Sequence, residues 1–255
     1  MDITIRTKWI IFVTVLLFTT GSVYVYNPFS SGNKRPLSLS SPSYTDTDIF
    51  RINPETILTS LDKGNTDVFL PDSRSLDDRY GGAIIYNKPT SWSQSDNLKI
   101  VSALNKFIWQ DTLDDWKLYS MIFNVDCQNG IKDLPGGVFT YFKTVFDKGR
   151  IVDTWREFEV DSEYSFVASG DGAKSVHPVL GRPSIDIDSL KVTAEDAIRI
   201  AEENGGRSAR LKVQNQCNIH LVLTPKGLQK GWWVNYGYST GFEIQIDPYT
   251  GKVLK

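Results

Sequence analysis

The chain has 255 residues, of which 40% are hydrophobic and 23% are charged, and its formal net charge is −2. This composition is typical of a globular protein, and the length allows one large domain or two small ones. The near-neutral charge provides neither the basic surface that nucleic acids require nor an acidic block for a cationic partner. We therefore expect no nucleic-acid binding.

Residues 9–26, WIIFVTVLLFTTGSVYVY, form an uncharged stretch that follows Arg6 and Lys8. The stretch is just long enough to cross a bilayer as a helix, and the basic residues before it favour export of the rest of the chain. The alternative is a cleaved signal peptide, because the most apolar part is short enough to be a signal-peptide core. Residues 1–26 are thus predicted to be a transmembrane anchor or signal segment, with the main domain outside the cytoplasm.

Residues 27–48 are rich in Ser, Pro and Thr and show no apolar period, which is typical of a flexible spacer. In residues 49–94, short apolar clusters are broken by Pro54, Gly64 and Pro71. This pattern favours an irregular segment that lies across a domain surface.

A helix is predicted for residues 96–109, where Leu98, Val101, Leu104 and Ile108 lie on one helical stripe and Asp96 is the expected N-cap. Antiparallel strands are predicted downstream, with a turn at Asp147-Lys148-Gly149. The predicted strands are residues 116–125, 138–146 and 150–161.

Residues 169–183, SGDGAKSVHPVLGRP, are rich in Gly and Pro and are predicted to be a linker between an N-terminal region, 49–183, and a C-terminal domain, 184–255. A second helix is predicted for residues 192–206, with a capping box from Thr193 to Asp196 and an end at Gly205. Further strands are predicted at residues 209–214, 218–224, 231–238, 242–247 and 252–255.

The region from about Leu190 to Lys255 resembles the PepSY domain. The resemblance rests on the helix TAEDAIRIAEENGG, the tryptophan strand WWVNYGY and the closing IDPYTGKVL. It implies an α+β fold in which a helix packs on an antiparallel sheet that closes in a hairpin. It also implies an extracytoplasmic or membrane-anchored protein that inhibits a protease or binds at the cell envelope, without enzyme activity or a cofactor.

The closing hairpin has a sufficient structural explanation. Pro248 presets the first corner of a turn, Gly251 can adopt the left-handed conformation, and Asp247 can accept hydrogen bonds from its own turn. We assign these three residues no catalytic role.

The N-terminal region is a candidate diverged copy of the PepSY-like unit. EFEVDSEYSFV, residues 157–167, aligns without a gap over EIQIDPYTGKV, residues 243–253, and each segment has a strand that ends on Asp. The match either reflects two units in tandem or is a chance similarity between two hairpins, which often share such patterns.

Two sets of residues are candidates for further roles. Cys127 and Cys217 either form a disulfide that joins the two halves or remain separate buried thiols. Trp232, Tyr236 and Tyr238 share one face of a predicted strand, which either binds a partner or is covered by the helix and the other half.

Catalytic and metal-binding patterns are weak. GYSTG, residues 237–241, matches G-x-S-x-G, but no histidine follows it and both flanks are predicted strands. The two histidines lack the spacing of metal ligands. We therefore predict a membrane-anchored, non-catalytic binding module with a protease or another envelope protein as its partner, and no metal site. The alternative is a structural cell-envelope protein without a ligand.

Overall fold

The computed structural model describes residues 47–72, 90–128, 134–163, 165–175, 181–225 and 231–254. The expected membrane segment, residues 1–26, and nearly all of the expected spacer lie outside these residues. Within the described part of the chain, no helix is both long enough and apolar enough to cross a membrane.

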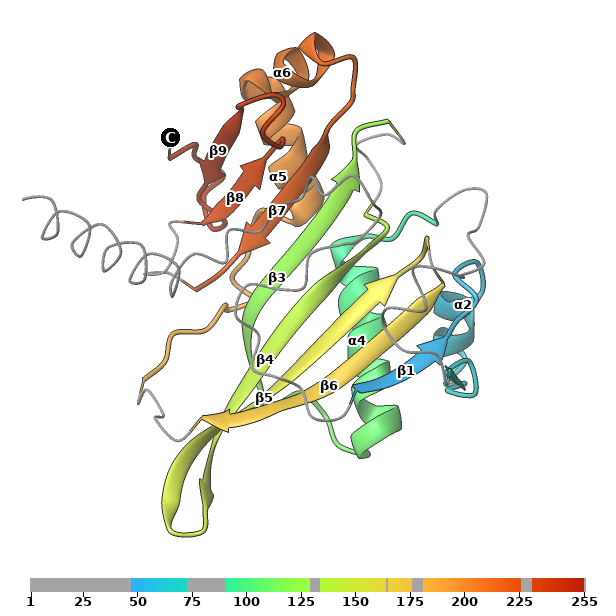
Figure 1. Cartoon of the computed structure of the whole chain (residues 1–255). Helices are drawn as coiled ribbons and strands as arrows, with labels where there is room; N and C mark the ends of the chain where they lie inside the picture. Colours follow the sequence, from blue (N-terminus) through green and yellow to red (C-terminus); the bar gives the residue numbers. More distant parts are fainter. Residues whose placement is uncertain are drawn as a thin grey trace, which may run out of the picture. The chain divides into compact units, whose positions relative to one another are not determined.

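The described residues have an α+β fold built on one antiparallel nine-stranded sheet, with strand order β2-β1-β6-β5-β4-β3-β7-β8-β9 (Figure 1). The elements are β1 (Thr47–Arg51), α2 (Ile57–Asp62), β2 (Leu70–Pro71), α4 (Gln94–Trp109), β3 (Lys117–Asp126), β4 (Gly136–Asp147), β5 (Arg150–Asp161), β6 (Phe166–Ser175), α5 (Ala194–Ala201), η1 (Glu202–Gly206), α6 (Arg207–Lys212), β7 (Asn218–Leu223), β8 (Trp232–Asn235) and β9 (Glu243–Ile246). The segment that we expected to be irregular thus contains β1, α2 and β2.

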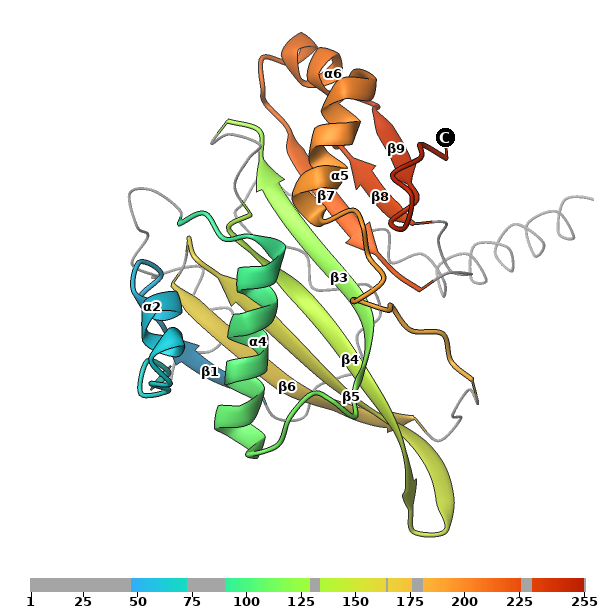
Figure 2. The same cartoon turned by 180° about the vertical axis from the view of Figure 1, so that it is seen from behind.

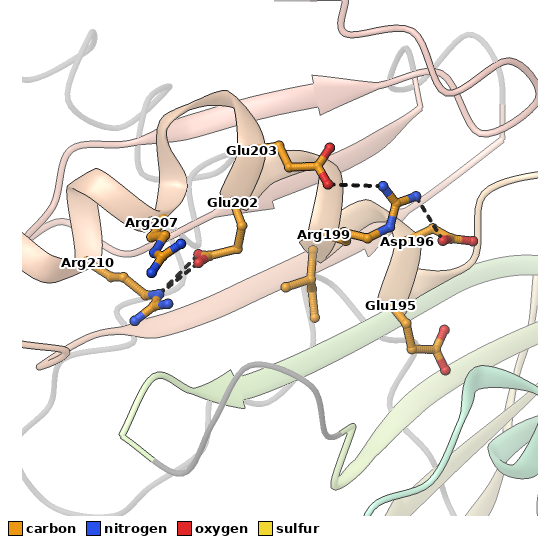
Figure 3. Close-up of a pocket in the computed structure, with 8 residues that line it drawn as sticks. Glu195, Asp196, Arg199, Glu202, Glu203, Arg207 and Arg210 are labelled. Carbon is orange, nitrogen blue, oxygen red and sulfur yellow. Dashed lines mark hydrogen bonds and ion pairs between the residues drawn. The ribbon is translucent and has the colours of Figure 1, made fainter.

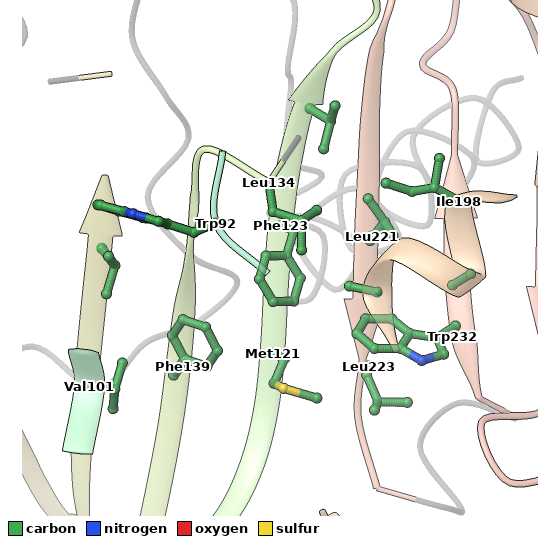
Figure 4. Close-up of a cluster of buried hydrophobic side chains, with 14 of the residues drawn as sticks. Trp92, Val101, Met121, Phe123, Leu134, Phe139, Ile198, Leu221, Leu223 and Trp232 are labelled. Carbon is green, nitrogen blue, oxygen red and sulfur yellow. The ribbon is translucent and has the colours of Figure 1, made fainter. Parts of the chain in front are cut away.

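The helices α4, α5 and α6 lie on the same side of the sheet (Figures 1 and 2). α4 packs on β4 and β5, whereas α5 packs on β8 and β9. One hydrophobic core lies between the helices and the sheet and continues from one half to the other (Figure 4). Phe123 of β3 is central to it, because its ring contacts Phe139 of β4 at 5.6 Å and Trp232 of β8 at 6.2 Å between centroids.

The N-terminus of α4 differs from the prediction. Ser93 is the N-cap, and Asp96 is the third helical residue, whose carboxylate accepts from the Ser93 backbone N–H at 2.9 Å. Asp96 therefore completes a capping box instead of forming the cap itself. Val101 and Leu104 are fully buried as predicted, whereas Leu98 and Ile108 of the same stripe are only partly buried.

β4 and β5 form a long hairpin that projects beyond the rest of the sheet (Figure 1). Asp147 pairs with Arg150, and the two loop residues Lys148 and Gly149 have φ values of 47° and 79°. Two positive φ values in a two-residue loop define a type I′ turn, which matches the twist of paired strands. The predicted turn and the predicted strand at 150–161 are both confirmed.

Two predictions along the chain are wrong. Residues 169–175, predicted as linker, belong to β6, which pairs with β1 and β5, so their glycines are tolerated inside a central strand. Residues 209–214, predicted as a strand, lie largely in α6, because Ala209, Arg210, Leu211 and Lys212 have high helix propensity. The remainder of the predicted linker up to residue 180 lies outside the described residues.

The two halves of the sheet meet where β3 pairs with β7. Ile122 lies opposite Val222, and the ladder continues to the backbone N–H of Cys127, which donates to the Cys217 carbonyl oxygen at 3.0 Å. Cys127 and Cys217 are joined by a disulfide, with their Cα atoms 5.4 Å apart. The junction between the halves is thus hydrogen-bonded, packed and covalently linked.

Candidate functional site

An open groove of about 510 Å³ runs along the outer surface of α5, η1 and α6 (Figure 3). Acidic and basic side chains dominate its lining, which consists of Glu195, Asp196, Ile198, Arg199, Glu202, Glu203, Arg207 and Arg210. Because all of these side chains come from one helical segment, the groove is a property of the C-terminal half alone.

The groove exists because the helical segment kinks within η1. Asn204 and Gly205 leave the helical conformation, with φ of 119° at Gly205, so α6 starts in a new direction. Only glycine adopts such a φ at low cost. The next residue, Gly206, lies so close to Tyr236 that a Cβ atom there would be 2.6 Å from the ring carbon Cζ and from the hydroxyl oxygen. The sequence Asn-Gly-Gly thus permits both the kink and the close packing of Tyr236.

Glu202 is a shielded carboxylate of the groove, and both of its oxygens accept hydrogen bonds. Arg210 Nε donates to its Oε2 at 2.9 Å, and the Tyr236 hydroxyl donates to its Oε1 at 2.8 Å. The side chains of Glu202 and Arg210 are only 11% and 16% exposed, so the pair is shielded from solvent. Burial, and then the hydrogen bond to Glu202, raise the pKa of Tyr236, which keeps the phenol protonated.

The outer rim of the groove carries an exposed ion-pair chain. Arg199 donates to Asp196 at 3.1 Å and to Glu203 at 3.2 Å, and these hydrogen bonds raise the pKa of its guanidinium. Exposed pairs of this kind contribute little stability because water and salt screen them. Arg207 is exposed and forms no ion pair with any residue that the structure describes. It is therefore the cation of the groove that is available to an anionic partner.

The inner end of the groove meets the N-terminus of α4. The Gln94 backbone N–H donates to Glu195 Oε1 at 2.6 Å, and the Ala194 backbone N–H donates to the Gln94 side-chain oxygen at 2.8 Å. Each helix thereby satisfies a free N–H group of the other. The second Glu195 oxygen is buried and accepts from no group in the described part of the protein.

Trp232, Tyr236 and Tyr238 do not form the partner-binding face that we considered. Trp232 and Tyr236 are fully buried under the helices, and Trp232 Nε1 donates to the Val192 carbonyl oxygen at 2.9 Å. Tyr238 alone is exposed, at 69%. Alternation along an extended strand places Trp232 and Tyr236 on one face, and that face is the one that packs under α5.

Asp247, Pro248 and Gly251 lie in the closing turn. Asp247 Oδ1 accepts from the backbone N–H groups of Tyr249 and Thr250 at 2.8 and 3.1 Å, and Gly251 has a φ of 73°. The Pro248 carbonyl oxygen accepts from the N–H groups of Lys191 and Val192, which ties the turn to the segment before α5. The predicted strand at residues 252–255 is reduced to a bridge between Val253 and Ile246.

The groove has only a weak signal in the sequence. Its signal was the spacing of opposite charges along a helix, with Asp196, Arg199 and Glu203 at i, i+3 and i+7. Such spacing is common on solvated helices, so it did not distinguish a site from an ordinary surface. The role of Tyr236 as a partner of Glu202 depends on the fold and had no sequence signal.

Across the described ranges, no three His, Cys, Asp or Glu side chains come together as a metal-binding group. The chain matches no protein family, no curated protein and no solved structure. The resemblance to the PepSY domain thus rests on the sequence segments quoted above.

Proposed function

We propose that the chain is a membrane-anchored, extracytoplasmic binding protein without catalytic activity, built from two PepSY-like units in tandem, and that it regulates a peptidase or another envelope protein. Several structural correspondences between the two halves support the tandem arrangement. From the β3–β7 junction outward, the strands of each half follow one another in sequence order. These are β3, β4, β5 and β6 on one side, and β7, β8 and β9 on the other.

The helices also correspond. Gln94 and Ala194, the first residues of α4 and α5, are 100 positions apart, and each helix begins with a capping box that uses an Asp. Ile122 and Val222 have the same separation and lie opposite each other at the junction. A two-fold relation between the halves places equivalent residues in this way.

The aligned segments 157–167 and 243–253 pair equivalently within their own halves. Val160 lies opposite Val167, and Ile246 lies opposite Val253, which are the same two positions of the alignment. This agreement supports duplication over chance similarity, because two unrelated hairpins need not pair the same two aligned positions.

The turns of the two segments correspond as well. Asp161 Oδ1 accepts from the Glu163 N–H at 2.9 Å, and Asp247 Oδ1 accepts from the Tyr249 N–H at 2.8 Å. Both turns therefore depend on an Asp at the same aligned position.

The groove supports binding as the function, and the contacts of Glu202 carry this argument. Both of its oxygens are engaged by Arg210 and Tyr236, so this shielded carboxylate stabilises the shape of the groove. The groove holds the paired charges of Glu202 and Arg210 in a fixed position and exposes Arg207 at its rim. This arrangement suits recognition of a polar segment that bears a carboxylate.

The proposal is tested by titrating the full chain in detergent against a panel of secreted peptidases and measuring residual activity and digestion of the chain. We expect saturable inhibition by uncleaved protein. Arg207→Glu should weaken it by about tenfold or more, as expected for loss of a charged contact, whereas Arg150→Glu, outside the groove, should not. Inhibition that is equal for both variants would reject the groove as the binding site, and no inhibition of any peptidase would reject the peptidase role.

The second candidate is a structural envelope protein. The burial of Trp232 and Tyr236 favours it, since these two large aromatic side chains of the C-terminal half serve packing. A protein that binds no peptidase, but whose removal alters envelope integrity, would support this alternative.

A further inference from the structure

The tip of the β4–β5 hairpin exposes apolar side chains that are not required to close the hairpin. Phe146 is 76% exposed and lies opposite Ile151, which is 42% exposed. The type I′ turn at Lys148 and Gly149 is sufficient to close the hairpin. Exposed large apolar side chains that gather at one place indicate a contact surface.

Two cations flank this apolar pair. Lys148 and Arg150 are exposed and form no ion pair with any described residue, and Asp147 is the single acidic residue between Phe146 and Ile151. An aromatic side chain with neighbouring basic groups suits the boundary between lipid headgroups and acyl chains.

The projecting part of the hairpin is specific to the N-terminal half. Thr140 pairs with Glu157 in this half, and Asn235 pairs with Glu243 at the corresponding place in the other half. The connection beyond the pair Thr140–Glu157 consists of residues 141–156, whereas the connection beyond Asn235–Glu243 consists only of residues 236–242. The repeat itself therefore does not require the extension.

The base of the hairpin is firmly held. The fully buried carboxylate of Asp153 accepts from the Thr144 hydroxyl at 2.7 Å and from Arg182 Nε at 3.0 Å. The Arg182 guanidinium lies over the rings of Trp155 and Phe142, at 5.0 and 5.8 Å from their centroids. These contacts fix the base of the hairpin.

The first described strand, β1, begins at the end of the sheet from which the hairpin projects. Thr47, the first residue of β1, pairs with Gly170, and β6 continues from there to Ser175, which pairs with Asp153 at the hairpin base. Because β1 runs antiparallel to β6, Thr47 lies at the end of β1 nearer the hairpin. The expected membrane segment, residues 1–26, precedes Thr47 in the sequence.

We propose that the tip formed by Phe146, Ile151, Lys148 and Arg150 inserts into the interface of an anionic bilayer and orients the body on the membrane. The proposal rests on the membrane anchoring proposed above. A protein partner is less suited to this tip, because a stable interface needs about 800 Å² on each side and the tip is narrow and convex. A bilayer requires no complementary shape.

The test uses the full chain reconstituted in phosphatidylcholine vesicles, with or without phosphatidylglycerol, that contain acyl-brominated lipid. Tryptophan fluorescence is compared between Phe146→Trp and Tyr238→Trp, a matched substitution at the exposed tyrosine of the other half. We expect the added tryptophan at position 146 to be quenched and blue-shifted, and the one at 238 to remain as in water. In the Phe146→Trp background, reversing Lys148 and Arg150 to Glu should abolish the quenching.

Failure of the hairpin insertion and failure of the proposed membrane anchoring give different results. A chain that resists alkaline carbonate extraction but shows no quenching at position 146 would keep the anchor and overturn the proposal. Quenching at 146 in a chain that carbonate extracts would support the hairpin contact and reject the anchor. Equal quenching at 146 and 238 would overturn the proposal as non-specific adsorption. An unquenched tip combined with weaker peptidase inhibition by Phe146→Ser would assign the hairpin to a protein partner instead.

Discussion

The Ala194 backbone N–H donates to the side-chain oxygen of Gln94 at 2.8 Å, so the first residues of α5 and α4 are hydrogen-bonded to each other. The Gln94 N–H in turn donates to Glu195. The two halves are therefore joined on the helical side of the sheet by specific polar contacts, in addition to the strand pairing at β3 and β7. This reciprocal contact makes the relative position of the two helix ends sensitive to one buried glutamine.

Replacing that glutamine should destabilise the protein. Gln94→Ala leaves the buried N–H of Ala194 without an acceptor, which typically costs about 1–3 kcal/mol. Ser95→Ala, at the exposed neighbouring position, should change the free energy of unfolding by less than about 0.5 kcal/mol. Urea denaturation measures both, and equal midpoints for the two variants would contradict the role of Gln94.

Arg156 should not tolerate replacement by lysine. Its guanidinium lies 4.1 Å from the ring centroids of both Trp109 and Trp116, and Nη1 donates to Asp111 at 2.8 Å. Lysine has no planar group that could stack between two rings, so Arg156→Lys should lower the unfolding free energy by about 2 kcal/mol. Arg150→Lys at the exposed hairpin tip is the control. A thermal denaturation series in which both substitutions are neutral would refute the stacking argument.

Gly206→Ala should displace Tyr236. The added Cβ would lie 2.6 Å from the tyrosine ring and hydroxyl, so α6 or the ring must shift, at a cost of about 1–3 kcal/mol. The shift should also break the hydrogen bond from Tyr236 to Glu202 and alter the groove. Near-ultraviolet circular dichroism reports the tyrosine environment. Ser208→Ala, which is exposed on the same helix, should leave that spectrum unchanged.

The disulfide should contribute strongly to stability. Cys127 and Cys217 are 90 positions apart, and loop-closure entropy for such a loop corresponds to about 4.6 kcal/mol. Replacing both cysteines by alanine avoids introducing buried hydroxyl groups. The denaturation midpoint of this variant should match that of the reduced wild-type protein. A reduced wild-type protein as stable as the oxidised one would contradict the prediction.

His220 should make the protein less stable in weak acid. Burial lowers the pKa of His220 to about 4, below the usual 6.5, so the unfolded chain binds a proton between these values while the folded protein does not. The contribution of His220 is therefore fully present above about pH 6.5 and is lost as the pH falls toward 4. His220→Gln should flatten the pH dependence of the unfolding free energy in this window. Identical slopes for wild type and variant would argue against it.

The local structure of the chain could be read from short-range patterns. The helix of residues 94–109, the strand of 150–161 and the turn at Lys148 and Gly149 each follow from a period or a turn residue that acts within a few positions. The second capping box, from Thr193 to Asp196, could be recognised for the same reason.

The errors arose where distant contacts decide the structure. The glycines of residues 169–175 indicated a linker, but β1 and β5 supply the hydrogen bonds that make this segment a strand. The alternation of Trp232 and Tyr236 indicated a shared face without revealing that α5 covers it. The groove depends on the kink at Gly205 and on Tyr236, which reaches Glu202 from a different element, so no local pattern predicted it.

The linkage between Cys127 and Cys217 also has a mechanical consequence. If the chain is tethered through its N-terminal side while a partner engages the α5–α6 surface, tension between the two attachments passes across the β3–β7 junction. In a sheet held by hydrogen bonds alone, this ladder would be the place to shear. The covalent link instead carries the load, so pulling on either half should move the body as a unit.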